Sequence, residues 1–99
     1  MAARGQGGPV NPATAVAWWL RSAERGYAPA QLALARALAE GRGVNADIGE
    51  AWLWANRAAR TGGDAGTQAK ALAQSLAQKL PPKTRQSLLQ KDEAWQVRP

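Results

Sequence analysis

The 99-residue chain contains no cysteine and no histidine. The first absence excludes a disulfide framework and a thiolate metal site, and the second removes the commonest general base and metal ligand. No stretch approaches the roughly 20 apolar residues of a membrane span, and the first residues lack the apolar core of a signal peptide. We therefore expect no membrane span and a cytoplasmic location, or a periplasmic or secreted one if a signal sequence precedes Met1.

Catalytic candidates are correspondingly few. Asp92 and Glu93 are adjacent, so on a helix their side chains diverge and do not form an acid–base pair. The serines have no histidine to activate them. The segment Gly41-Arg42-Gly43 follows an expected helix rather than a strand, which argues against a phosphate-binding loop. The sequence thus predicts no enzyme activity, no cofactor and no metal.

The formal net charge is +6, from 13 lysines and arginines against 7 acidic residues. This excess favours acidic partners. Because the cations are spread along the chain rather than gathered in one run, nucleic-acid binding is the less favoured interpretation. Tryptophans beside arginines are able to stack on bases, but Trp18 and Trp54 fall at a packing position of a repeat, so we expect both in the core. For Trp19 and Trp52 the sequence leaves two roles open: each is either a core residue or a hot spot for a partner.

The chain repeats itself with a period of 36 residues: the segment that begins at Trp18 returns at Trp54, and the helix cap Asn11 returns as Asp47. Periods of this size are typical of stacked helical hairpins. Apolar residues at three- and four-residue spacing predict helices, and the expected helices span residues 12–25, 29–40, 48–60, 65–79 and 82–95. With no strand pattern, the sequence predicts an all-α fold, a short α-solenoid of five antiparallel helices.

The middle of the chain carries a more specific pattern. It opens with Ala28-Pro29-Ala30-Gln31, passes through the loop Gly41-Arg42-Gly43-Val44 with Asp47 three residues later, and then reaches Trp54. These residues resemble the Sel-one-like repeat, a short relative of the tetratricopeptide repeat. Alanine and leucine replace the family's usual glycine and aromatic residues at Ala35, Leu38 and Ala55. The resemblance implies a structural role at Asn11, Trp18, Gly26, Leu34, Leu38, Gly41, Gly43, Asp47, Ala51, Trp54, Ala58 and Gly62.

The repeat pattern also divides the chain. We expect a partial repeat at residues 5–26, a full repeat at 27–62, a partial repeat at 63–80 and a C-terminal capping helix at 81–99. On this pattern the chain begins in the middle of a unit. Either an upstream region is missing from the sequence, or the first helix lacks its hairpin mate.

The resemblance implies that the first helix of each hairpin lines a concave, partner-binding face. That face would include two rows spaced by four residues, namely Leu32, Arg36 and Glu40, and Lys70, Gln74 and Gln78. We expect a segment of another protein with acidic residues to dock there, which makes the chain an adaptor or scaffold. Two alternatives stay open: a structural subunit packed permanently into a larger assembly, and a basic nucleic-acid-binding module.

Overall fold

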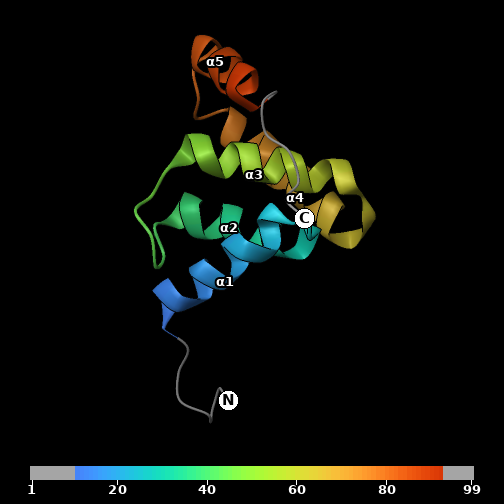
Figure 1. The fold of residues 1–99 in the computed structure, drawn as a ribbon. Coiled ribbons are helices and arrows are strands. Elements are labelled where there is room, and N and C mark those ends of the chain that lie inside the picture. The colour runs from blue at the N-terminus through green and yellow to red at the C-terminus, as the bar shows by residue number, and fades with distance from the viewer. Residues whose placement is uncertain (1–10, 93–99) are drawn as a thin grey trace.

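The computed structural model describes residues 11–92, which form five α-helices and no strand. The helices are α1 Pro12–Glu24, α2 Ala28–Glu40, α3 Ile48–Thr61, α4 Gly63–Ala77 and α5 Pro82–Asp92. Each of the first three packs on the next, so that α2 lies between α1 and α3 (Figure 1). The predicted all-α class is therefore confirmed.

The helix starts keep the period of the sequence. Asn11 Oδ1 accepts a hydrogen bond from the backbone N–H of Ala13 at 2.8 Å, and Asp47 Oδ1 accepts one from that of Glu50 at 3.0 Å. These side chains satisfy amide groups that the first helical turn leaves without a partner. The second helix of each unit therefore begins at equivalent positions, Pro12 and Ile48.

The fourth helix begins two residues before its expected start at residue 65. Gly62 ends α3 and directly precedes α4, with φ 87° and ψ −166°. Only glycine adopts this conformation easily, so a single residue makes the turn that we expected to be longer. The last helix was expected to reach residue 95, and residues 93–99 lie outside the described part of the chain.

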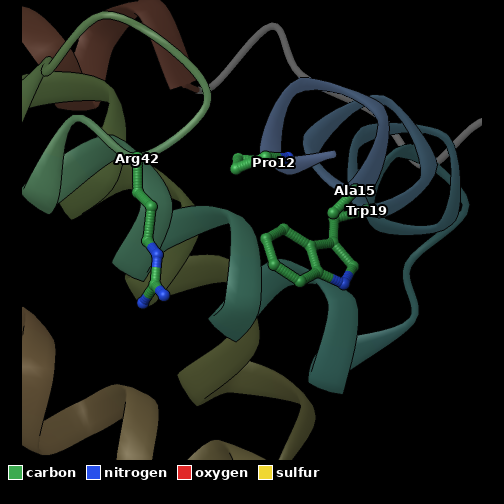
Figure 2. Close-up of a pocket in the computed structure, with 4 residues that line it drawn as sticks. All are labelled: Pro12, Ala15, Trp19 and Arg42. Carbon is green, nitrogen blue, oxygen red and sulfur yellow. The ribbon is translucent and has the colours of Figure 1, made fainter. Parts of the chain in front are cut away.

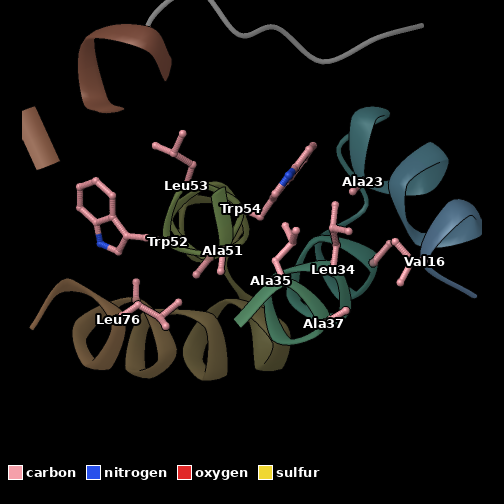
Figure 3. Packing of buried hydrophobic residues seen from close by; sticks show 14 residues of the cluster. Val16, Ala23, Leu34, Ala35, Ala37, Ala51, Trp52, Leu53, Trp54 and Leu76 are labelled. Atoms are coloured by element: carbon pink, nitrogen blue, oxygen red, sulfur yellow. The ribbon is translucent and has the colours of Figure 1, made fainter. Parts of the chain in front are cut away.

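The core is centred on α3, which packs between α2 and α4. Leu53 is fully buried and Trp54 is 5% exposed, and the buried side chains around them come from α1, α2 and α4 (Figure 3). Trp52, left open from the sequence, is also buried. Alanines such as Ala35, Ala51 and Ala55 carry little side-chain bulk, so they let the helices approach closely.

Trp18 contradicts the sequence prediction that it belongs to the core, because the structure leaves it 64% exposed. The helix face that α1 buries against α2 instead carries Val16 and Ala23. The equivalent Trp54 is covered because α3 has further helices around it, whereas α1 contacts mainly α2. The repeat position therefore fixes where the tryptophan points but not what covers it.

The loop between α2 and α3 is seated against the start of α1. Gly43 has a φ of +79°, and a Cβ atom at this position would lie 2.5 Å from the carbonyl carbon and oxygen of Pro12. No side chain fits so close to backbone atoms, so glycine is required here both for its conformation and for its size. This contact packs the α2–α3 loop of one repeat against the first residues of α1, which belongs to the preceding repeat.

The final helix lies on α3 rather than extending the stack beyond α4 (Figure 1). Leu88 is half-buried against the backbone of Gly49, while Lys83, Gln86 and Gln90 are exposed, as expected for an outer face. Among the described helices, none is long and apolar enough to cross a membrane.

Candidate protein-interaction surfaces

The exposed side of α2 is narrow, because neighbouring helices enclose most of its surface. Only Pro29, Arg36 and Glu40 are fully exposed along its length. Arg36 Nη2 donates a hydrogen bond to Gln68 Oε1 of α4 at 2.9 Å. This bond joins α2 and α4, the first helices of two successive units, into one polar surface.

Leu32 does not belong to this surface, which corrects the sequence prediction. Its side chain is 6% exposed and packs in a small apolar cluster with Ala28, Ala58 and Ala69. Because both α3 and α4 contact α2, the buried face of α2 is wider than the single stripe that three- and four-residue spacing predicts. Leu32 therefore stabilises the junction of three helices instead of meeting a partner.

The row predicted on α4 is exposed but does not start beside Arg36. Lys70 is two residues from Gln68, so it projects about 200° around the helix from the side chain that Arg36 contacts. Lys70 instead lines a hollow of about 450 Å³ between α3, α4 and α5, whose other walls are Asn56, Ala59, Arg60, Leu89 and Asp92. Gln74 is exposed further along α4, and Gln78 is exposed at the C-cap of that helix. The two predicted rows thus do not form one continuous groove.

Two of the residues that line this hollow, Arg60 and Asp92, belong to an ionic cluster that the sequence did not predict. Arg57 Nε donates to Asp92 Oδ1 at 2.7 Å, and Arg60 Nη2 donates to Asp92 Oδ2 at 2.8 Å. The side chains of Arg57 and Asp92 are each 7% exposed, whereas that of Arg60 is 64% exposed. The Arg57 guanidinium also lies over the ring of Trp54, 4.4 Å from its centroid, where the ring face attracts a cation.

A signal for this cluster does exist in the sequence, although it is weak. Arg57 stands between Asn56 and Ala58 on a helix that is otherwise apolar toward the core, and a buried cation requires an anionic partner. That partner is 35 residues away in the sequence, so no local spacing rule identifies it. In the sequence, Asp92 stands out only as one of two adjacent carboxylates.

A second hollow, of about 420 Å³, opens where the α2–α3 loop meets α1. It is lined by Pro12, Ala15 and Trp19 of α1 and by Arg42 of the loop (Figure 2). Trp19 is half-buried and packs against the core, so its indole is only partly available to a partner. The walls are apolar except for the exposed guanidinium, which suits an apolar side chain that is followed by an acidic one.

No group of three potential metal-ligating side chains occurs among residues 11–92. The Sel1 repeat family model matches the chain twice, over residues 1–27 and 28–62, and the second match spans α2 and α3. No curated protein and no solved structure matches the chain. Sel1 repeats generally mediate protein–protein interactions, and their helical fold is typically non-enzymatic. Because the two matches cover more than half of the sequence, the chain belongs to the Sel1 repeat family.

Proposed function

We propose that this protein is an adaptor that binds an acidic segment of another protein along the exposed sides of α2 and α4. The observation that carries the proposal is the hydrogen bond between Arg36 and Gln68, which makes one surface from two helices. Ser75 follows Gln68 at seven residues, so it is exposed on the same side of α4, and Lys79 is exposed in the turn just after that helix. This surface replaces the two rows predicted from the sequence, and it keeps Arg36 and Glu40 of α2.

The charges of this surface suit an acidic partner. Arg36 and Lys79 supply two exposed cations, beside the exposed carboxylates Glu40 and Asp64, and Arg36 contacts only the neutral side chain of Gln68. The whole chain carries a formal charge of +6, which attracts anionic segments from a distance. An acidic side chain that reaches Arg36 displaces only a neutral amide contact with Gln68, so the guanidinium is ready to form a stronger, charge-assisted bond.

The test compares three forms of the tagged protein in affinity capture from its native lysate, with nuclease present. We expect the wild type to retain a stoichiometric protein, Arg36→Glu to lose it, and Lys83→Glu on the outer side of α5 to retain it. Titration of the purified partner should then show at least a tenfold loss of affinity for Arg36→Glu, which is about 1.4 kcal/mol.

Two outcomes would refute the proposal. Equal affinity of the wild type and Arg36→Glu would exclude the α2–α4 surface as the binding site. Capture that disappears with nuclease, together with an affinity that falls steeply with salt, would instead indicate nucleic-acid binding.

A further inference from the structure

The exposed side of α1 is the repeat equivalent of the side of α3 that α5 covers. We propose that it is a second docking surface, built on Ala17, Trp18 and Arg21, for a short amphipathic helix of another protein. That helix carries a leucine and an acidic residue four positions apart, as α5 does. The site is separate from the α2–α4 surface, so neither proposal depends on the other.

The equivalence of α1 and α3 rests on their geometry as well as on their sequences. The two helices begin 36 residues apart, at Pro12 and Ile48, directly after the side-chain caps. Each residue of α1 therefore corresponds to the residue of α3 that is 36 positions later. α1 also packs on α2 as α3 packs on α4, each being followed by the first helix of the next unit.

The way in which α5 binds α3 defines the chemistry of the docking helix. Leu88 lies against Gly49, where an added Cβ would be 3.2 Å from Leu88 Cδ1. One turn further along α5, Asp92 binds the buried Arg57. Between these contacts Leu53 is fully buried, on the side of α3 toward which α5 lies (Figure 3). α5 thus contacts α3 through a leucine and an aspartate at positions i and i+4, which lie on one face of the helix.

The same positions on α1 are exposed. Ala17 and Arg21 correspond to Leu53 and Arg57, and both are open to solvent. Together with Thr14 and Trp18 they line a hollow of about 230 Å³. Trp18 is 64% exposed whereas its equivalent Trp54 is 5% exposed, and a large exposed aromatic side chain beside an arginine is the usual composition of an interface hot spot.

The differences between the two faces specify the partner further. Ala13 replaces Gly49, so the leucine of the docking helix must lie a few tenths of an ångström further from α1 than Leu88 lies from α3. Thr14 replaces Glu50, which contacts Lys91 of α5 at 3.8 Å, so the docking helix needs no lysine there. Glu24 replaces Arg60, so a single acidic residue directed at Arg21 is the complementary arrangement.

The occupant is a helix of another protein rather than α5 of a second copy. In each copy Asp92 is already bound to Arg57 and Arg60 of its own α3. Withdrawing α5 to bind a neighbour would leave the Arg57 guanidinium without this carboxylate in a buried position, which is costly. A separate helix with the same chemistry meets no such cost.

The probe is a helix-constrained peptide with the sequence of α5, Pro82–Asp92, added to the intact 99-residue protein labelled with ¹⁵N on the tryptophan indoles. The Trp18 signal is assigned with Trp18→Phe. We expect the peptide to shift that signal in a saturable way, and Arg21→Glu to weaken binding at least fivefold. A peptide with Asp92→Lys should bind Arg21→Glu better than it binds the wild type. The matched control is Arg25→Glu, an exposed arginine of the same chain segment that should bind like the wild type.

Three results would overturn the inference. One is a Trp18 signal that does not respond to millimolar peptide. Another is a response that Arg21→Glu leaves unchanged or that the charge-swapped pair does not restore. The third is a Trp18 signal that shifts with protein concentration alone while sedimentation shows a dimer, since a second copy would then be the occupant.

Discussion

Asp92 and Arg57 are 35 residues apart in the chain, yet Arg57 Nε donates to Asp92 Oδ1 at 2.7 Å in a position where both side chains are 7% exposed. The contact fixes the last described helix on α3. Arg60 binds the other carboxylate oxygen and Trp54 covers the guanidinium of Arg57. Three residues of one helix are thereby organised around a single carboxylate from another.

Neutralising this carboxylate should destabilise the protein strongly. Asp92→Asn keeps the shape of the side chain but removes the negative charge that the buried Arg57 contacts, a loss of about 3–5 kcal/mol. Lys91→Gln, which removes only an exposed contact of 3.8 Å with Glu50, should cost less than about 1 kcal/mol. Urea unfolding of both variants measures the difference, and similar midpoints would show that the buried pair contributes little.

The two equivalent tryptophans should differ sharply in their contribution to stability. Trp54 is 5% exposed and Trp18 is 64% exposed. Trp54→Ala opens a cavity in the core and should cost about 3–5 kcal/mol, whereas Trp18→Ala should cost less than about 1 kcal/mol. Thermal unfolding of the two variants provides the comparison. A large loss for Trp18→Ala would contradict its exposed position.

Gly43 should tolerate substitution less well than another glycine with a similar backbone conformation. Gly43 and Gly63 have φ values of +79° and +72°, but only at Gly43 would a Cβ meet backbone atoms, those of Pro12 and Ala13. Alanine should cost about 1–2 kcal/mol at Gly63 from conformation alone, and about 1–3 kcal/mol more at Gly43 from overlap. Equal losses in chemical unfolding would mean that the loop is not seated on α1 as described.

Substitutions at Leu32 and at Arg36 should differ strongly in their effect on the free energy of unfolding. Leu32→Ala removes a side chain that is 6% exposed and packed by three helices, and should cost about 2–5 kcal/mol. Arg36→Ala removes an exposed side chain and should change the free energy of unfolding by less than about 1 kcal/mol. Denaturant titration of each variant measures both values. A stable Leu32→Ala variant would restore the original prediction that Leu32 faces solvent.

Local signals in the sequence were sufficient to predict the helices. The caps at Asn11 and Asp47, the glycine turns and the apolar spacing depend on residues within a few positions of one another, and the five helices lie close to where these signals put them. The exception is α4, which was expected at residues 65–79 but begins and ends two residues earlier, because Gly62 alone makes the turn before it. Turn length depends on one residue's conformation, which spacing does not specify.

What surrounds each helix was harder to predict. Leu32 was expected outside and Trp18 inside, and both predictions were wrong because burial depends on how many neighbouring helices cover a face. The spacing of apolar residues along one helix carries no information about that number. The partner of Arg57 was missed for the same reason, since it comes from a helix that is distant in the sequence.

The separation of Arg57 and Asp92 also has a consequence for the order of events during synthesis. At about 5–20 residues per second, Arg57 leaves the ribosome a few seconds before the carboxylate that neutralises it, which is 35 residues later in the chain. Until then the first four helices are present, but Arg57 lacks its contact with Asp92. Arrival of α5 therefore completes the packing around Arg57, and a chain released before Asp92 would leave uncovered the positions of α3 that α5 contacts, including Gly49.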